Sequence, residues 1–141
     1  MAAALIDQFC RIYKGLGKDN LSLLELIYSD DINFIDALHN LQGLEQLSDY
    51  FSHLYANLLL CDFTIEEVIQ EEGKACILWT MEYAHPQINK AKPILVNGCS
   101  HLKFEEKIYY HRDFVDMGQM LYEHLPLLGG VIRTVKKRIA S

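Results

Sequence analysis

Apolar residues recur every three or four positions through the first part of the chain, which is the period of a helix with one buried side. The first stripe of this kind consists of Leu5, Ile6, Phe9, Ile12, Tyr13 and Leu16. Gly15 and Gly17 are expected to end this helix. A second helix is predicted from about Asn20, with Ser22 and Glu25 forming a capping box at its start.

A third helix is predicted after a short extended segment. The acidic pair at residues 30–31 closes the second helix, and residues 32–36 then form a strand that leads into a loop over residues 37–42. Gly43 precedes the longest helical pattern of the chain, which covers residues 44–58. A helix of this length with one apolar side is expected to pack against a broad surface.

From residue 63 onward the period changes from 3.6 to 2, which is typical of β-strands. Four long strands are predicted, over residues 63–69, 75–84, 94–104 and 107–114. Tight turns at 72–73 and 105–106 and a loop over 85–93 join them. The pattern favours consecutive antiparallel pairing.

Residues 117–141 form a helical tail in this interpretation. A helical segment over residues 117–124 is followed by a break at Pro126 and at the pair Gly129 and Gly130. A basic helix comes after the break and carries Arg133, Lys136, Lys137 and Arg138.

Helices first and long antiparallel strands afterwards define an α+β order. We expect the N-terminal helices to pack on one face of a strongly curved, mainly antiparallel sheet, so that a cone-shaped α+β barrel encloses a pocket. Residues 1–141 are expected to form one domain, with 117–141 as its tail.

Composition narrows the functional classes. A net charge of −6 argues against a nucleic-acid surface, which needs clustered basic residues. The four cysteines form no CxxC pair and the histidines are dispersed, so we expect no metal and no disulfide framework. No apolar stretch is long enough for a signal core or a membrane span. These features favour a reduced, cytoplasmic protein without a cofactor.

The most informative stretch is residues 107–116, KIYYHRDFVD. Residues two apart on a strand share a face, so His111 and Asp113 point to one side while Tyr110, Arg112 and Phe114 point to the other. If His111 and Asp113 face inward, two groups that exchange protons lie in the interior. We therefore expect this strand to line the pocket.

The chain resembles a known family in the segment IYSDDINFIDALHNLQGLEQLSDYF, residues 27–51, and in the closing YHRDFVD. Both are similar to the nuclear transport factor 2-like superfamily, in particular its SnoaL-like branch. The resemblance implies the cone-shaped fold and a homodimer. It leaves the activity open, because this superfamily contains isomerases, cyclases, hydrolases and proteins without any catalytic role.

The resemblance also implies site residues. Asp36 stands where ketosteroid isomerases have their proton-shuttling base, and Tyr13 lies near the place of their hydrogen-bond donor. Ser100 replaces the protonated acid of those enzymes. Asp113 matches an aspartate of limonene epoxide hydrolases, but Trp79 and Met81 stand where their arginine and second aspartate are expected. An acid with a histidine, as in SnoaL-like cyclases, fits His111 and Asp113.

Each candidate also has a structural interpretation. Asp36 is equally suited to capping the following turn, and Asp113 to pairing with Arg112. His111 is typical of a hydrogen-bonded core histidine. Trp79 and Met81 are typical of a core or of an apolar pocket wall. The residues that we expect to line a ligand pocket are Trp79, Met81, Ser100, Leu102, His39, Phe51 and Tyr55.

Two hypotheses of different classes follow. In the first, the protein is a small enzyme for an apolar carbonyl or cyclic molecule, with Asp36 or Asp113 as base, His111 as acid or orienting partner and Tyr13 as donor. In the second, it is a non-catalytic module that uses the same cone to bind a ligand or partner. An apolar outer sheet face, indicated by Cys76, predicts a homodimer in both cases. We expect neither nucleic acid nor membrane as a partner.

Overall fold

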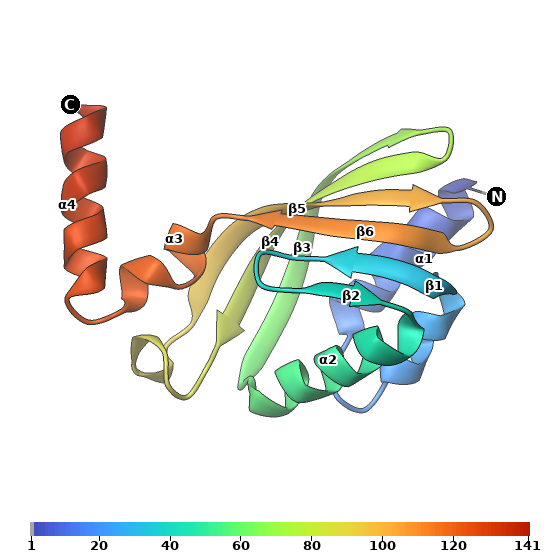
Figure 1. Ribbon diagram of the computed structural model, residues 1–141, viewed down its shortest axis with the longest axis horizontal. Coiled ribbons are helices and arrows are strands. Elements are labelled where there is room, and N and C mark those ends of the chain that lie inside the picture. The colour runs from blue at the N-terminus through green and yellow to red at the C-terminus, as the bar shows by residue number, and fades with distance from the viewer. Residues whose placement is uncertain (1) are drawn as a thin grey trace.

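The computed structural model describes residues 2–141 and has an α+β fold with a six-stranded sheet (Figure 1). Its elements are α1 (Ala2–Gly15), η1 (Leu21–Leu26), β1 (Tyr28–Ile35), β2 (Asn40–Gln42), α2 (Leu44–Asn57), β3 (Leu60–Glu71), β4 (Lys74–Ala84), η2 (Asn89–Ala91), β5 (Ile94–Phe104), β6 (Ile108–Val115), α3 (Met117–Met120), η3 (Tyr122–His124) and α4 (Leu128–Ala140). The predicted fold class is confirmed.

The sheet has the order β2-β1-β6-β5-β4-β3 and is antiparallel except for the pair β1 and β6. It is curved and does not close. Strand β6, which holds the stretch KIYYHRDFVD, is thus a central strand between β1 and β5. The parallel pair brings Phe34 of β1 beside His111 of β6, although they lie far apart in the sequence.

The main core lies between the sheet and helices α1 and α2. The complete predicted stripe of α1 is buried in it, as are Leu47 and Phe51 of α2. Burying large apolar side chains of this kind is the main driving force for folding. A second, smaller cluster of Tyr83, Ile94 and Val96 lies at the other end of the sheet.

The second predicted helix and its capping box are wrong in detail. The segment is the 3₁₀-helix η1, preceded by Asn20, whose side chain makes no capping bond. The Asn20 amide instead joins the preceding turn, accepting from the Gly17 backbone and donating to the Gly15 carbonyl. Strand β1 begins as early as Tyr28, so the acidic pair 30–31 lies inside a strand.

The tail differs from its prediction at the glycine pair. Gly129 and Gly130 lie in the first turn of α4 and do not interrupt it. Gly129 approaches the Glu123 carbonyl so closely that a Cβ atom has no room there. Helix α4 therefore begins against η3 and runs away from the sheet (Figure 1).

Over residues 2–141, no helix has both the length and the apolar character that a membrane crossing requires.

Candidate functional site

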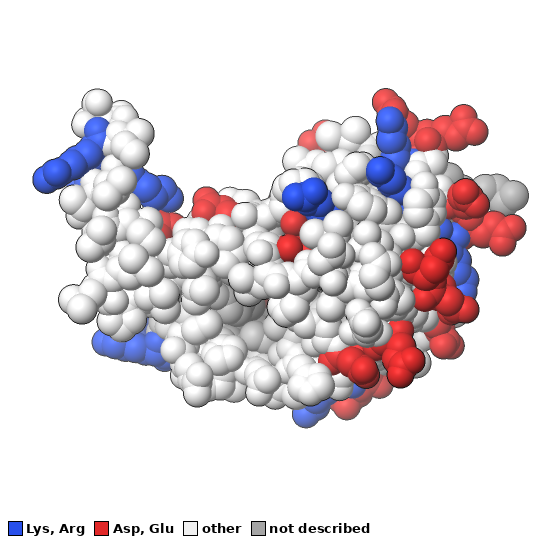
Figure 2. All heavy atoms as spheres, viewed as in Figure 1, with Lys and Arg blue, Asp and Glu red and all other residues white. Residues whose placement is uncertain are grey.

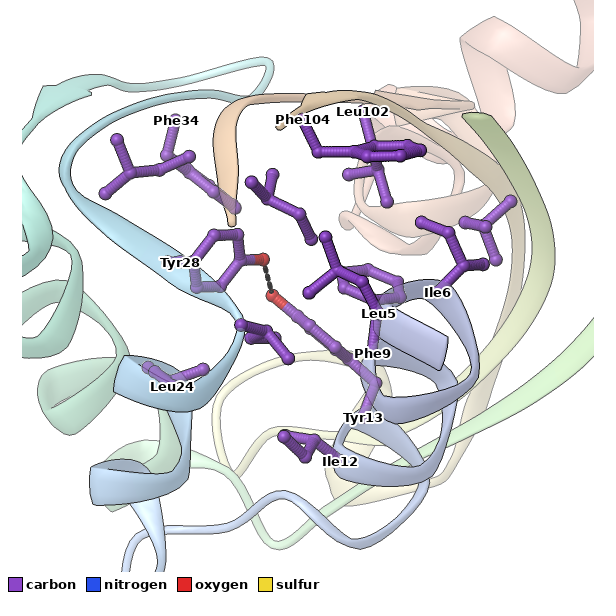
Figure 3. Close-up of a cluster of buried hydrophobic side chains, with 14 of the residues drawn as sticks. Leu5, Ile6, Phe9, Ile12, Tyr13, Leu24, Tyr28, Phe34, Leu102 and Phe104 are labelled. Atoms are coloured by element: carbon purple, nitrogen blue, oxygen red, sulfur yellow. Dashed lines mark hydrogen bonds between the residues drawn. The ribbon is translucent and has the colours of Figure 1, made fainter. Parts of the chain in front are cut away.

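A chain of hydrogen bonds crosses the core from α1 to β6. The Tyr13 hydroxyl lies 2.5 Å from the Tyr28 hydroxyl, a contact drawn in Figure 3. The Tyr28 hydroxyl lies 2.6 Å from Nδ1 of His111, and Nε2 of His111 lies 2.6 Å from Oδ1 of Asp113. Three of these side chains are buried, with His111 only 1% exposed. The chain ends at Asp113, which is 22% exposed.

A second branch reaches the same carboxylate from β4 and β5. Trp79 donates from Nε1 to Oγ of Ser100 at 2.9 Å, and Ser100 donates from Oγ to Oδ1 of Asp113 at 2.5 Å. Oδ1 of Asp113 is therefore the meeting point of both branches. Among the described residues, Oδ2 of Asp113 has no hydrogen-bond partner.

The directions of these bonds follow from the inventory of donors and acceptors. When Nε2 of His111 donates to Asp113, its Nδ1 can accept from the hydroxyl of Tyr28. The Tyr28 oxygen is then free to accept from Tyr13, so every hydroxyl proton has an acceptor. In this arrangement, each hydrogen bond of the chain from Tyr13 to Asp113 is donated in the direction of Asp113. The carboxylate therefore accepts at the end of the chain and is held in place.

Burial raises the pKa of Tyr13 and Tyr28 well above the ordinary tyrosine value. The cause is the loss of hydration, because a phenolate in the core has no water to stabilise its charge. For Tyr13, the nearby Tyr28 and Asp113 raise the pKa further. Both phenols therefore stay protonated at neutral pH and remain hydrogen-bond donors.

Asp113 borders a very small cavity inside the cone. The cavity has a volume of about 10 Å³, and its lining is Phe9, Tyr13, Phe63, Ile65, Trp79, Ser100 and Asp113. That volume holds about one water molecule. Aromatic rings fill much of the space around it, since Tyr13 packs edge-on against both Phe63 and Phe51.

Asp36 does not join this network. Its Oδ1 accepts from the backbone N–H groups of Leu38 and His39, at 2.9 and 2.7 Å, and lies 3.1 Å from Nδ1 of His39. Tyr50 donates its hydroxyl to Oδ2 at 2.8 Å. Phe34 contacts the rings of both His111 and Tyr50, so it separates the two polar clusters. The bonds of Asp36 are those of a turn cap.

The other predicted pocket residues are dispersed. Leu102 and Phe51 are buried in the main core, and Met81 is partly buried between the two apolar clusters. Tyr55 is partly buried beside Cys61, and burial raises the pKa of both groups, that of Cys61 to about 11. His39 packs on the Tyr50 ring at the β1–β2 turn. Only Tyr13, Trp79, Ser100 and Asp113 of the predicted residues line the interior cavity.

Arg112 is not the partner of Asp113. Its guanidinium lies over the Phe114 ring, 4.8 Å from the centroid, on the opposite face of the sheet. The alternation along β6 therefore places His111 and Asp113 inward, as predicted.

Sequence reasoning missed Tyr28, which connects Tyr13 to His111. Tyr28 shares the even spacing of the buried Ile32 and Phe34, but the exposed residues 30–31 interrupt the alternation, and the predicted strand begins only at residue 32. Its signal is positional: a tyrosine that directly follows the buried Ile27 at the start of a strand. In the described part of the chain, no group of three or more His, Cys, Asp or Glu side chains is arranged to hold a metal ion.

Solved structures share this arrangement of helices on a curved sheet. A protein from Catenulispora acidiphila with a ketosteroid isomerase-like fold, solved with trimethylamine, is 17% identical with a TM-score of 0.70, over 82% of this chain and 87% of that one. A SnoaL-like polyketide cyclase from Shewanella putrefaciens is 16% identical with a TM-score of 0.70, over 83% and 93%. An NTF2-like protein of unknown function from Burkholderia pseudomallei is 11% identical with a TM-score of 0.72, over 82% and 93%.

These likenesses show that the chain has an NTF2-like fold. Within it, the model of the SnoaL-like domain matches residues 9–111. The chain therefore belongs to the SnoaL-like family. No curated protein matches the chain. Identities this low carry the fold and not the activity of the neighbours.

Proposed function

We propose that this protein is a small acid–base enzyme for a compact, largely apolar carbonyl or cyclic molecule, with Asp113 as its base. One observation carries the proposal: two hydrogen-bond branches converge on Oδ1 of Asp113 and leave its Oδ2 without a partner among the described residues, and Asp113 lines the cavity. A positioned carboxylate with one unengaged oxygen is suited to accept a proton from a bound substrate.

The surrounding residues have supporting roles in this proposal. His111 and Ser100 orient Asp113 and stabilise its charge. Tyr28 fixes the His111 ring, and Tyr13 holds Tyr28 while lining the cavity itself. The side chains of Phe63, Ile65 and Trp79 supply the apolar wall that a carbonyl compound contacts. Asp36 has no part in the reaction, because its oxygens are engaged in the turn.

Substrate entry requires a side chain to move, since the cavity has room for about one water. Phe63 is the residue best placed to do so. It lies on the edge strand β3, is only partly buried, and contacts Tyr13 and Trp79 through its ring. Displacing this ring joins the cavity to the outside.

The nearly filled interior also favours a second candidate, a non-catalytic module whose cone is simply its core. A thermal-shift screen with small cyclic ketones separates the two. A ligand that binds only the folded state raises the melting temperature. If the enzyme proposal is correct, Asp113→Asn should alter the ligand-induced rise in melting temperature, and Asp36→Asn should keep it. If no compound raises the melting temperature of the protein, the non-catalytic module is favoured.

We further propose a homodimer that forms through the outer face of the sheet. This face carries exposed apolar side chains on neighbouring strands, among them Leu95 at 62% and Phe114 at 48% exposure. Cys99 of β5 lies opposite Phe114, and Leu78 of β4 lies opposite Cys99. A second copy is the simplest partner to cover such a surface.

A further inference from the structure

Helix α4 has an apolar side that its own chain does not cover. The helix lies at the end of the molecule opposite the N-terminus and the β5–β6 turn (Figure 1), and it packs chiefly against η3. Val131, Val135 and Ile139 follow one another at intervals of four residues along one side and are exposed, Ile139 by 80%. An isolated helix of this length is marginal in water. The stripe is therefore suited to packing against another surface.

Lys136 and Arg138 lie beside this stripe, whereas Arg133 and Lys137 lie on the opposite side of the helix. All four charged residues of α4 are basic, although the chain as a whole has a net charge of −6. Arg133 and Lys136 are engaged with Glu123 of η3. Over residues 2–141, Lys137 and Arg138 form no ion pair, so their charges are available to a partner.

A surface with the opposite charge lies at the other end of the molecule. A cleft of about 1030 Å³ opens there between the start of α1, the start of β1 and the β5–β6 turn. Its lining includes the carboxylates of Asp30, Asp31, Glu105 and Glu106, and also Leu26 and Tyr109, two apolar side chains exposed by 47% and 41%. Figure 2 shows acidic residues gathered at this end and basic residues on α4.

Lys107 also lines the cleft, but its ammonium group is already engaged. It donates to the carbonyl oxygen of Glu25 at 2.6 Å. The carboxylates on both sides of the cleft thus outnumber the positive charge there. The cleft therefore combines acidic and exposed apolar side chains, which are complementary to the apolar stripe and basic residues of α4.

We propose that α4 of one copy docks in the acidic cleft of a second copy. The stripe of Val131, Val135 and Ile139 would cover Leu26 and Tyr109, while Arg138 beside the stripe meets the carboxylates of the cleft. Because helix and cleft lie at opposite ends, the contact joins two different surfaces. If the rotation that relates two copies is twofold, the contact forms a reciprocal dimer. Otherwise it joins the copies into a longer assembly. It adds to the sheet-face dimer and does not depend on the proposed catalysis.

Charge reversal tests the contact on the full-length protein. The variant Lys137→Glu with Arg138→Glu reverses the helix, and Glu105→Lys with Glu106→Lys reverses the cleft. All four positions are exposed, so the fold is not at risk. Each variant is expected to weaken self-association about tenfold or more in sedimentation, because both contacts then place like charges together. Lys14→Glu with Lys18→Glu, which makes the same change in net charge as the helix variant on exposed residues elsewhere, is expected to leave association unchanged.

Mixing the two reversed variants is the decisive step. Their charges are complementary again, so the mixture is expected to associate as strongly as the original protein. In the original protein, carbodiimide cross-linking of labelled with unlabelled chains is expected to join Lys136 to Glu105 or Glu106 between copies. Association should also weaken as the salt concentration rises from about 0.1 to about 1 M, because the Debye length falls from about 10 to about 3 Å.

Three results would overturn the proposal. The first is a protein that stays monomeric at high concentration. The second is self-association that neither charge reversal weakens, as expected for a dimer held only by the sheet face. A mixture of the two reversed variants that does not regain the original association would count equally. The third is Lys137- and Arg138-dependent binding to phosphatidylserine vesicles without any cross-link between copies, which would make a lipid surface the partner of α4.

Discussion

Nε2 of His111 lies 2.6 Å from Oδ1 of Asp113, two residues further along the same central strand. The period of two along β6 places both side chains on the inner face, so this contact follows from local geometry. The position of the imidazole is determined from its other side by Tyr28, which comes from β1. A neighbouring strand therefore fixes the ring that holds the carboxylate.

Removing the Tyr28 hydroxyl tests this link. Tyr28→Phe leaves Nδ1 of His111 and the hydroxyl of Tyr13 without their shared partner in the core. Unpaired buried polar groups cost about 1–3 kcal/mol, so the free energy of unfolding in urea should fall by about that much. Tyr109→Phe is the control, because this exposed hydroxyl has no partner among the described residues, and its change should stay within about 0.5 kcal/mol. Equal values for the two variants would mean that the chain of bonds contributes nothing.

Stability is expected to fall at alkaline pH. The pKa values of Tyr13 and Tyr28 are raised by burial in the folded state, whereas unfolded tyrosines ionise near pH 10. Above that pH the unfolded chain binds fewer protons than the folded one, so the free energy of unfolding decreases as pH rises. Each such group contributes a slope of up to about 1.4 kcal/mol per pH unit. Urea unfolding between about pH 8 and about pH 11 measures this slope, and a flat profile across pH 10 would contradict the burial of these phenols.

Opening the cavity should create a binding site. Phe63→Ala removes the ring that contacts Tyr13 and Trp79, and it enlarges the space beside Asp113. We expect the variant to be less stable than the original protein. Adding cyclohexanone should raise the melting temperature of the variant more than that of the original protein. Val68→Ala, on the exposed part of the same strand, serves as the control without a new cavity. A variant that binds no better than this control would count against Phe63 as the entrance.

The proposed sheet-face dimer has its own test. Leu95→Ser places a polar side chain on the outer face, and the dimer should dissociate more readily in sedimentation experiments. Leu38→Ser makes the same chemical change at a residue of similar exposure in the β1–β2 turn, and it should leave the dimer intact. Identical dissociation constants for the two variants would argue that the outer face is not the interface.

Much of the fold was predictable from local patterns. The α1 stripe and the alternation of β4, β5 and β6 each depend on a regular period, and the structure confirms them. The wrong predictions lie where a residue has a contact that its local pattern does not indicate. Asn20 engages the preceding turn and not a helix end, and Gly129 is required by contact with η3 and not by a helix stop.

The candidate site was predictable only in part, for a similar reason. The inward direction of His111 and Asp113 follows from alternation alone. The partners Tyr28 and Ser100 depend on strand register, which the sequence does not specify. Asp36 matches a family position, yet the partners of its oxygens come from its own turn and from Tyr50. The volume of the cavity is set by packing of side chains from several elements and has no local signal.

The central claim is that the Asp113 carboxylate acts as a base and accepts a proton from the carbon next to the carbonyl of a bound compound. The direct measurement is deuterium exchange at the carbon next to the carbonyl of a ligand identified by thermal shift, followed by NMR. Asp113→Asn should slow the protein-dependent exchange by about a hundredfold or more, the usual contribution of a general base, while Asp36→Asn should leave it unchanged. Exchange that continues at the original rate in Asp113→Asn, or that disappears in Asp36→Asn instead, would contradict the account.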